Sequence, residues 1–520
     1  MNKLLAKMIQ DNLSCDDIKN KVCFSFVDSN DEVNYLEFYR KVSDYVKKIK
    51  YNLEKNSPVI VATKMDIDSI CLIIACLISG VIPVIKSFDS NKERNVFKIK
   101  RFIADNPIFN TIISTFPIDE CESLACNVIN VNKVNNHIRY NISKLNNDTG
   151  FIFQETSGTN SETKLVLMTE EQVFNSMKEV NKILDNNFIN LSYLPFSHIF
   201  GLISTILLTL YKNGTAYVML PSSFKNSPNK YLDIIKEKKV SYLSMTNFGI
   251  KQLINGYSKI NDYNLESIDT IYIGGDIVEY NLLKHFYDIY YPYGLKKTAF
   301  SPIYGMTEMG GLISYNSNRD TIDEKTVDGI SSCGVPNNEF VKILLRNNDM
   351  IEEPLDDICG ELLVNSKNLF SDYFNSQNSG DFIMYRNERY FCTGDIVEIH
   401  NNRIYIIGRK KNILVKNSNK YSPFALDRVI SDLKKDNSLL NSHFVSFDNQ
   451  IVLFQEIDVE KIGKMDFDDI KRKILEKTMK YYNLVLDDII FISPRDVPKT
   501  ELGKVKKLEL IKKYQEHIYD

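Results

Sequence analysis

The sequence contains no tryptophan, no repeat and no low-complexity tract, and it carries almost no net charge. Its 64 Lys and Arg residues nearly balance 67 Asp and Glu residues, which leaves a net charge of -3. A chain with this balance has no global attraction to nucleic acid or to an anionic membrane. With 520 residues, of which 43% are hydrophobic, it is long enough for about three to four structural units around large cores.

Nine cysteines are scattered along the chain without the spacing of a metal site. The closest pairs, Cys71/Cys76 and Cys121/Cys126, lie five residues apart with no histidine beside them. This pattern disfavours both a zinc site and a disulfide framework. Free cysteines are typical of a reducing compartment, so we predict a cytoplasmic protein.

Long apolar runs are also missing. The most apolar stretch, residues 70–85, contains Gly80 and Pro83 and is shorter than the roughly 20 residues that a membrane span needs. Residues 1–14 lack the sustained apolar segment of a targeting signal. We therefore expect no membrane span, and we interpret residues 70–85 as a buried helix that runs into a buried strand.

The sequence does contain an alternation of short β-branched runs with segments of helical period. Strand, helix, strand, helix and strand are predicted in turn at residues 59–63, 66–79, 81–85, 91–104 and 111–115. The alternation resumes with a strand at 151–155, a polar loop, and a helix capped by Thr169 with Gln172 at the capping-box spacing. Further strands are predicted at 189–194, 216–220, 240–243 and 270–273. This βαβ pattern predicts an α/β fold of doubly wound, mostly parallel sheets.

The pattern changes past about Gly360. Short strands and turns at residues 390–391, 396–399 and 403–407 predict a β-rich subdomain. After Arg409 an α+β pattern begins, with a helix opened by Ser422-Pro423, two strands around Asp448-Asn449 and a charged helix at 466–482. We expect a large N-terminal domain of residues 1–408 and a small, mobile α+β C-terminal domain of residues 409–520.

The strongest single motif is the run Thr-Ser-Gly-Thr-Asn-Ser-Glu-Thr-Lys from Thr156 to Lys164, between a predicted strand and a predicted helix. Hydroxyl groups and backbone N–H groups around a glycine can converge on phosphate oxygens, and Lys164 adds a positive charge. Taken alone, the run is explained equally well as an ordinary polar turn.

Six further motifs follow in order along the chain. They are Leu-Pro-Phe-Ser-His-Ile-Phe-Gly at 194–201, Gly-Gly-Asp at 274–276, Tyr-Gly-Met-Thr-Glu at 304–308, Thr-Gly-Asp at 393–395, Gly-Arg-Lys-Lys at 408–411 and Pro-Lys-Thr-Glu-Leu-Gly-Lys at 498–504. Together with the first motif, this series from Phe151 to Lys504 resembles the adenylate-forming superfamily. That superfamily includes acyl-CoA synthetases, adenylation domains of nonribosomal peptide synthetases and firefly luciferase.

The resemblance implies a site for ATP and Mg²⁺. The loop would bind the β- and γ-phosphates, Tyr304 would stack on adenine, and Thr307 would bond the α-phosphate. Glu308 would hold Mg²⁺, for which a carboxylate oxygen is a suitable ligand, and Asp395 would accept the ribose hydroxyls. The implied nucleotide-binding residues are Thr156, Ser157, Gly158, Thr159, Lys164, Gly274, Gly275, Asp276, Tyr304, Gly305, Asp395 and Arg409. Glu308 and Asp395 also have structural interpretations, as a helix N-terminal charge and a turn cap.

The resemblance further implies that Lys504 is catalytic, together with Thr307 and Glu308. Its ammonium would bridge the substrate carboxylate and the α-phosphate while charge develops between them. On composition alone, Lys504 is one more exposed lysine in a lysine-rich segment, and only the neighbouring Thr500 and Gly503 at the family spacing favour catalysis. Lys411 occupies the hinge position about which the small domain would turn.

The substrate acid is expected to be apolar. Amino-acid-activating relatives typically carry an aspartate in the motif at 194–201 that pairs the substrate ammonium, and this chain has none there. Burying an unpaired ammonium is costly, so an acyl or aryl acid is favoured, with Asp276 as the one carboxylate that could receive an amine. The candidate acid-binding residues are His198, Met245, Asn247, Phe248, Ile303 and Met306. His198 is explained equally well as a core histidine.

Five positions depart from the family pattern, and one of them is Asn412, which stands where an acidic residue often follows the hinge. Ser161, Thr163 and Leu165 stand where the family loop usually has glycine, proline and glycine, which predicts a less flexible loop and puts the rate of adenylation in doubt. Asn417 stands where a hairpin glycine belongs, which predicts a narrower path for the acceptor thiol. Asparagine is also the residue that best tolerates left-handed geometry after glycine, so a harmless turn remains an alternative.

The sequence therefore predicts an enzyme that uses ATP to convert a carboxylic acid to an acyl-adenylate with release of pyrophosphate. Transfer of the acyl group to the pantetheine thiol of an acyl or peptidyl carrier protein is expected to follow. Free coenzyme A as the acceptor, an amino acid as the substrate, and a non-catalytic nucleotide-binding homologue remain alternatives. Nucleic acid is not expected as a partner.

Overall fold

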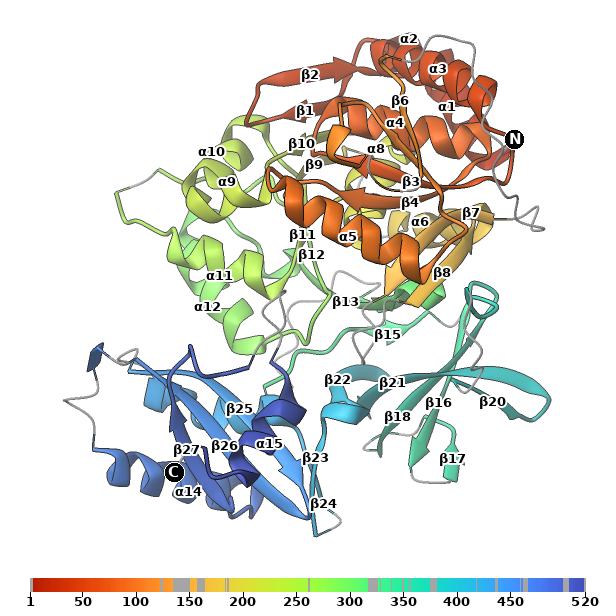
Figure 1. Ribbon diagram of the computed structural model, residues 1–520. Helices are drawn as coiled ribbons and strands as arrows, with labels where there is room; N and C mark the ends of the chain where they lie inside the picture. The colour runs from red at the N-terminus through yellow and green to blue at the C-terminus, as the bar shows by residue number, and fades with distance from the viewer. Residues whose placement is uncertain are drawn as a thin grey trace.

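The computed structural model arranges the chain in three regions (Figure 1). Two large sheets with their helices form the upper body in the figure, an antiparallel sheet from residues 341–409 lies at lower right, and the C-terminal elements lie at lower left. The structure describes residues 3–121, 124, 126–133, 150–156, 164–182, 184, 187–260, 262–316, 326–327, 329–337, 339–347, 350–354, 356, 358–374, 381–417, 419–434, 438–458, 460–461, 466–498 and 505–518.

The first large sheet has seven strands and a parallel centre. Its order is β19 (Tyr373–Phe374), β8 (Lys164–Thr169), β7 (Gly150–Thr156), β4 (Ile82–Ser87), β3 (Pro58–Thr63), β5 (Thr111–Ser114) and β6 (Asn127–Asn130). The strands from β7 to β6 run parallel, whereas β8 and β19 are antiparallel additions at one edge. The helices α4 (Ile67–Ser79) and α5 (Lys92–Asp105) connect the strands, which confirms the alternation predicted for residues 59–115.

Helix α4 explains the most apolar run of the sequence. Asp66 caps its N-terminus by accepting a hydrogen bond from the Ser69 N–H group, and Gly80 ends it in a left-handed conformation with φ 80°. Ten of its 13 residues are buried, because the helix packs against strands of both large sheets. Neither α4 nor any other helix in the described ranges is long and apolar enough to cross a membrane.

The second large sheet has nine strands. Its order is β15 (Val335–Pro336), β14 (Gly311–Tyr315), β13 (Phe300–Met306), β12 (Thr270–Ile273), β11 (Tyr242–Met245), β9 (Ile189–Ser192), β10 (Thr215–Val218), β1 (Val22–Phe26) and β2 (Asp31–Asn34). The strands from β13 to β1 are parallel, and the edge strands are antiparallel. The longer helices of this body are α1 (Lys3–Ser14), α3 (Tyr35–Asn52), α6 (Glu170–Asn181), α10 (Pro228–Lys238), α11 (Asn247–Asn255) and α12 (Tyr280–Tyr290). One large apolar cluster joins both sheets.

The remaining elements form the predicted β-rich and α+β regions. The antiparallel sheet contains β16 (Val341–Asn347), β17 (Met350–Glu352), β18 (Ile358–Ser366), β20 (Phe382–Tyr385), β21 (Glu388–His400) and β22 (Arg403–Arg409). The C-terminal part contains the hairpin of β23 (Leu414–Lys416) and β24 (Asn419–Tyr421), the sheet of β25 (Leu439–Phe447), β26 (Gln450–Ile457) and β27 (Asp488–Ile492), and the helices α13 (Pro423–Val429), α14 (Phe467–Tyr482) and α15 (Lys507–Gln515).

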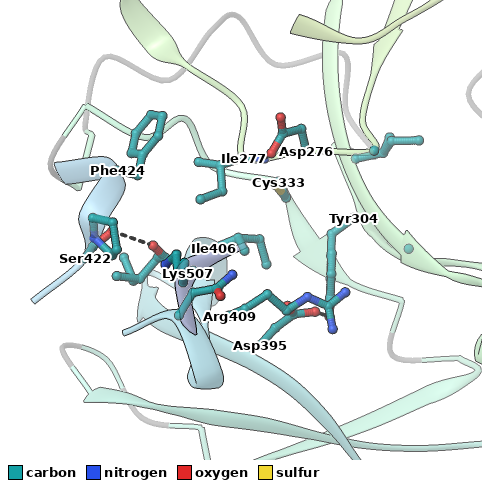
Figure 2. A pocket seen from close by; sticks show the side chains of 17 residues that line it. Asp276, Ile277, Tyr304, Cys333, Asp395, Ile406, Arg409, Ser422, Phe424 and Lys507 are labelled. Atoms are coloured by element: carbon teal, nitrogen blue, oxygen red, sulfur yellow. Dashed lines mark hydrogen bonds and ion pairs between the residues drawn. The ribbon is translucent and has the colours of Figure 1, made fainter. Parts of the chain in front are cut away.

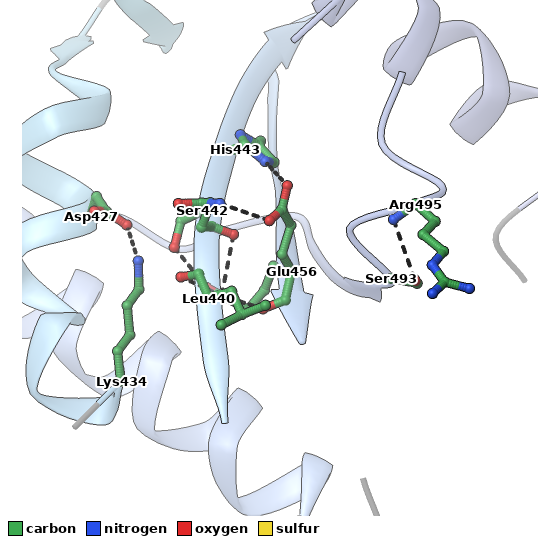
Figure 3. Close-up of polar contacts among 10 residues, drawn as sticks. Asp427, Lys434, Leu440, Ser442, His443, Glu456, Ser493 and Arg495 are labelled. Atoms are coloured by element: carbon green, nitrogen blue, oxygen red, sulfur yellow. Dashed lines mark hydrogen bonds and ion pairs between the residues drawn. The ribbon is translucent and has the colours of Figure 1, made fainter. Parts of the chain in front are cut away.

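A buried polar network fixes the register of β25 against β26 (Figure 3). The register shifts between Leu439 and Ser442, and the fully buried Gln455 donates from Nε2 to the carbonyls of Leu440 and Asn441 at 3.3 Å each. A register shift of this kind interrupts the backbone hydrogen bonds between the two strands, and the Gln455 amide supplies hydrogen bonds to the two carbonyls instead. The buried Glu456 carboxylate likewise lies 2.9 Å from His443 Nε2 and accepts from Asn441 Nδ2 at 2.8 Å.

Two local predictions were wrong, and several were confirmed. The segment between the polar loop and the helix at Thr169 is strand β8, because it adds to the open edge of β7. The two short strands predicted at 390–391 and 396–399 are one continuous strand, β21. Thr169 and Gln172 form the predicted capping box of α6, and Ser422 caps α13 ahead of Pro423 as predicted.

Candidate functional site

A cavity of about 360 Å³ lies where the N-terminal and C-terminal regions meet. It brings together seven of the residues predicted for the nucleotide and acid sites: Gly275, Asp276, Ile303, Tyr304, Gly305, Asp395 and Arg409. Ser422, Phe424 and Lys507 line it from the C-terminal region. Figure 2 shows Ser422 and Phe424 on the opposite side of the view from Tyr304, with Asp395 and Arg409 below.

Tyr304, Asp395 and Arg409 form one hydrogen-bonded network in this cavity. The Tyr304 hydroxyl donates to Asp395 Oδ2 at 2.6 Å, and Arg409 Nε lies 2.7 Å from Asp395 Oδ1. Burial raises the pKa of the Asp395 carboxyl, and the Arg409 charge opposes that shift. Each carboxylate oxygen has a second lone-pair direction, so Asp395 can still accept a hydrogen bond from a ligand. The three side chains can therefore present an aromatic face, an acceptor and a cation to one molecule.

The strand arrangement explains how distant motifs reach this network. Tyr304 lies on β13, and Asp395 and Arg409 are register partners on the paired strands β21 and β22. Arg409 also donates from Nη1 to the Thr393 carbonyl at 3.0 Å, and the Thr393 hydroxyl accepts from the Asp395 N–H group at 3.1 Å. The Thr-Gly-Asp and Gly-Arg-Lys-Lys motifs thus meet because their strands are hydrogen-bonded neighbours.

Two glycines let the backbone approach the cavity closely. Gly275 has φ 85°, a left-handed conformation that side chains disfavour. A Cβ atom at Gly305 would lie 2.0 Å from the Gly311 carbonyl oxygen, since β13 and β14 approach each other there. Both positions therefore require glycine, and both lie on the cavity wall.

Glu308 lies in a second group of charged residues. It belongs to the short 3₁₀ helix η5 (Thr307–Met309), is 7% exposed, and accepts at Oε1 from the Tyr373 hydroxyl at 2.7 Å. Burial raises the pKa of its carboxyl, and the Tyr373 hydrogen bond lowers it. Lys164 lies 4.1 Å from the centroid of the Tyr373 ring and pairs with Asp381 at 2.9 Å. Tyr373 therefore contacts both Glu308, which is predicted to hold the metal ion, and Lys164, which is predicted to bind phosphate.

This donor set fits a Mg²⁺ ion that is bound together with phosphates. The described residues contain no group of three or more His, Cys, Asp or Glu side chains able to hold a metal on their own. Mg²⁺ usually binds through one or two carboxylates plus substrate phosphates and keeps several waters. Glu308 is a suitable single carboxylate, and Thr307 beside it supplies a hydroxyl.

The predicted acid-binding residues are more dispersed. Ile303 lines the cavity, and Asn247 donates from Nδ2 to the carbonyl of Ile277, another lining residue, at 2.6 Å. Met245 is fully buried at the end of β11, whereas Phe248 is 46% exposed and His198 is exposed just before the helical turn at Ile199. Met306 ends β13 beside Thr307. Of the six predicted acid-binding residues, Ile303 lines the cavity and the other five do not.

Several predicted residues fall outside the described part of the chain. Ser157, Gly158, Thr159, Ser161, Thr163 and Lys504 are among them. Thr156 is described as the last residue of β7, where it is the register partner of Lys164. On the C-terminal side, the Lys506 N–H group donates to the Pro498 carbonyl at 2.8 Å. The next residue, Lys507, lines the cavity.

Lys411 lies in the connection between the two regions, and Asn417 lies in the hairpin that follows it. Lys411 is exposed in the 3₁₀ helix η6 (Lys410–Asn412), between β22 and β23. Asn417 has φ 51°, so its backbone is left-handed. Its N–H group donates to Asn449 Oδ1 and its own Oδ1 accepts from Asn449 Nδ2, each at 2.7 Å. The backbone of Asn417 therefore has the left-handed turn geometry that the alternative interpretation predicts.

Several residues of the site have no functional role predicted from the sequence, among them Ser422, Phe424 and Lys507 on the cavity wall and Tyr373 and Asp381 beside Lys164. Tyr373 and Asp381 lie in segments where no motif was recognised; strand pairing places Tyr373 beside Lys164, and a hydrogen bond joins it to Glu308. Phe424 directly follows the predicted cap Ser422-Pro423, and Lys507 lies three residues after Lys504. Their proximity to recognised motifs was the available signal for these two.

Comparison with known proteins finds a matching family and similar ligases. Residues 14–374 match the family described as AMP-binding enzyme. A medium-chain fatty acid [acyl-carrier-protein] ligase from Moorena producens is 22% identical over 414 residues, which cover 72% of this chain and 69% of that protein. A ligase of the same description from Teredinibacter turnerae is 24% identical over 401 residues, covering 69% of this chain and 62% of that protein.

Among solved structures, the fold matches one from a study of fatty acyl-adenylate ligases from E. coli and L. pneumophila. The TM-score is 0.81 at 16% sequence identity, and the match covers 99% of this chain and 98% of the other. At this identity the likeness shows the fold, and its coverage includes the C-terminal region. The large N-terminal and small C-terminal parts together form the two-domain architecture predicted from the sequence.

Proposed function

The chain belongs to the AMP-binding enzyme family, and on that premise we propose that it activates a fatty or similarly apolar carboxylic acid with ATP and passes the acyl group to a carrier-protein thiol. The observation that carries this proposal is the network of Tyr304, Asp395 and Arg409 in a cavity lined by both regions. The names of the two ligases, which act on medium-chain fatty acids and an acyl carrier protein, support the choice of acid and acceptor.

The proposed reaction has two steps. In the first, a substrate carboxylate oxygen attacks the α-phosphorus of ATP, and the bond from that phosphorus to the β-phosphate oxygen breaks. Pyrophosphate leaves with the electron pair, and an acyl-adenylate remains. In the second, a pantetheine sulfur attacks the acyl carbon, a thioester forms, AMP leaves, and the thiol proton passes to solvent.

The cavity residues would bind the nucleotide. Tyr304 would offer its ring to adenine beside the bare backbone of Gly274 and Gly275, and Asp395 would accept the ribose hydroxyls while Arg409 keeps it ionised. Residues 156–159 and Lys164 would hold the β- and γ-phosphates, and Thr307 the α-phosphate. Glu308 would hold Mg²⁺, which supplies positive charge against the triphosphate.

Lys504 is proposed as the catalytic cation that stabilises charge between the carboxylate and the α-phosphate. The neighbouring Lys507 lines the cavity, which supports the approach of this segment to the site. We propose residues 1–408 and 409–520 as the two domains, with Lys411 as the hinge for the turn between the two steps.

Acid-dependent exchange of pyrophosphate into ATP tests the first step. We expect exchange with one or more medium-chain or aryl acids, and transfer of the same acyl group to a phosphopantetheinylated carrier protein. Calorimetric binding of ATP without exchange for any acid in a broad panel would favour a non-catalytic nucleotide-binding protein. Faster exchange with a proteinogenic amino acid than with any fatty or aryl acid would show that the proposed acid class is wrong.

A further inference from the structure

Tyr373 lies between two parts of the proposed nucleotide site. Its strand β19 runs antiparallel to β8, with Tyr373 opposite Val166, two residues beyond Lys164. On its other side is Glu308 in η5, whose sequence position is 65 residues away. The strand pairing places Tyr373 beside Lys164, and the hydrogen bond across to η5 adds Glu308.

The side chain of Tyr373 contacts both charged groups at once. Its hydroxyl donates to Glu308 Oε1 at 2.7 Å. Its ring lies under the Lys164 ammonium, with 4.1 Å between Nζ and the ring centroid, which is within the range of a cation–π interaction. One residue therefore holds the carboxylate proposed for Mg²⁺ and the lysine proposed for the phosphates.

The segment that carries Tyr373 is itself firmly held. Tyr373 is 8% exposed, and its ring centroid lies 4.8 Å from that of Phe370. The Phe370 N–H group donates to the Glu308 carbonyl at 2.8 Å, so the same segment fixes the backbone of Glu308. From α6, Gln172 Nε2 donates to the carbonyls of Asn368 and Leu369 at 3.2 and 3.3 Å. The hydroxyl of Tyr373 is thus presented from a rigid support.

The ion pair between Lys164 and Asp381 is exposed to solvent, in contrast to the buried side chain of Tyr373. Their side chains are 40% and 41% exposed, and exposed ion pairs contribute little because water screens them. A triphosphate can therefore replace Asp381 as the partner of Lys164 at small cost. The ring of Tyr373 does not compete with phosphate, so it can keep its contact with the ammonium after that exchange.

We propose that Tyr373 is a positioning residue of this site: its hydroxyl fixes Glu308 in one orientation, with Oε2 presented to a divalent cation, and its ring keeps Lys164 beside the phosphates. The inference rests on the proposed function, because it concerns a bound nucleotide and cation. Hydrogen-bond partners of metal ligands orient the ligand, and their loss typically weakens metal affinity about 10–100-fold.

The test is the substitution Tyr373→Phe, which removes the hydroxyl and keeps the ring. We expect the affinity for Mn²⁺, measured by electron paramagnetic resonance in the presence of a non-hydrolysable ATP analogue, to fall about 10–100-fold. Pyrophosphate exchange should need a correspondingly higher Mg²⁺ concentration and should recover when Mg²⁺ is saturating. Affinity for the ATP analogue at saturating Mg²⁺ should stay within about twofold, because the ring contact to Lys164 remains.

Tyr390→Phe is the matched control. Tyr390 is also buried and donates its hydroxyl to a carboxylate, Glu388 Oε2, at 3.1 Å, but in the β20–β21 hairpin away from the cavity. This variant should bind Mn²⁺ as the wild type does. If Tyr373→Phe also binds Mn²⁺ normally and only its melting temperature falls, Tyr373 is merely structural and the inference is wrong.

The same measurements separate this inference from the proposed function. A wild-type protein that binds the Mn²⁺–analogue complex but exchanges pyrophosphate with no acid would contradict the proposed reaction, while the Mn²⁺ affinities would still decide the role of Tyr373. A wild-type protein that binds no Mn²⁺–analogue complex would overturn both.

Discussion

Two carboxylates of the site are buried, and each receives a hydrogen bond from a tyrosine hydroxyl. Asp395 is 3% exposed and bonded to Tyr304, and Glu308 is 7% exposed and bonded to Tyr373. A buried carboxylate is costly unless it is paired or hydrogen-bonded. Asp395 also has the Arg409 guanidinium at 2.7 Å. These partners keep both groups in fixed orientations, which favours binding by a preorganised site.

At the residue scale, Lys504→Ala should reduce pyrophosphate exchange by two or more orders of magnitude while ATP binding is largely kept. The reason is that the ammonium acts on charge that develops in the transition state. Exchange kinetics and calorimetric ATP binding measure the two effects. Lys506→Ala is the control, since its side chain is half exposed and pairs with Glu509 on the surface of α15. Near-normal exchange by Lys504→Ala would show that its proposed role is wrong.

At the element scale, β8 changes the interpretation of Leu165. The sequence analysis placed it in the loop, where the family usually has glycine. Leu165 instead lies in β8, is 1% exposed, and packs in a cluster with Phe153 and Phe374. Its side chain is therefore part of the core of the first sheet.

We expect Leu165→Gly to lower the free energy of unfolding by about 3–5 kcal/mol, because it removes a buried side chain and adds backbone freedom in a strand. Urea denaturation measures this loss, and Leu165→Ala separates the side-chain part from the backbone part. If Leu165→Gly keeps wild-type stability and adenylates faster, the residue acts through the loop, as its alignment with the family glycine suggested.

The hairpin of β23 and β24 leads to a second prediction at this scale. Asn417 already has the left-handed backbone that glycine would adopt, so Asn417→Gly changes mainly the side chain paired with Asn449. If the Asn417 amide narrows the path of the acceptor thiol as proposed, acyl transfer to free coenzyme A should rise several-fold in this variant, and adenylation should stay unchanged. Single-turnover transfer from the acyl-adenylate to coenzyme A and to a carrier protein measures this. If the wild type transfers the acyl group rapidly to coenzyme A and Asn417→Gly does not change that rate, Asn417 does not limit access of the thiol.

At the scale of the whole molecule, α13 docks the C-terminal region onto the N-terminal one. Phe424 packs against a cluster that includes Ile330, Ile396 and Ile407, and the Ser422 hydroxyl donates to the Ile407 carbonyl at 2.9 Å. Arg428 lies so close to Gly329 that a Cβ atom there would be 1.3 Å from its Nη1. In this orientation residues of both regions line the cavity, which suits the first step.

Phe424→Ala should therefore slow adenylation more than acyl transfer. Losing a half-buried phenyl ring from this contact costs about 1–2 kcal/mol, which corresponds to a roughly 5–30-fold decrease in pyrophosphate exchange. Transfer from preformed acyl-adenylate should be unchanged, because the proposed turn about Lys411 would take the C-terminal domain out of this contact. Leu508→Ala, at an 84% exposed position on α15, is the control. Equal losses in both steps would contradict an orientation-specific role.

The sequence alone was enough to identify the family and the α/β architecture and to name seven of the residues that line the cavity. Local signals fixed α4 between Asp66 and Gly80 and the capping box at Thr169 and Gln172, because caps and periodicity depend on nearby residues. The motifs at Tyr304, Asp395 and Arg409 were recognised from their order, and the structure brings these three residues into contact. What they bind stays a prediction.

The residues that support that site follow from the fold and not from any motif. The pairing of β19 with β8 puts Tyr373 beside Lys164, the packing of η5 adds Glu308, and the docking of α13 puts Phe424 on the cavity wall. The addition of β8 to β7 makes Leu165 a core residue. These contacts join residues distant in sequence, and they depend on strand order and on packing between regions, neither of which is encoded in local propensity or in short motifs.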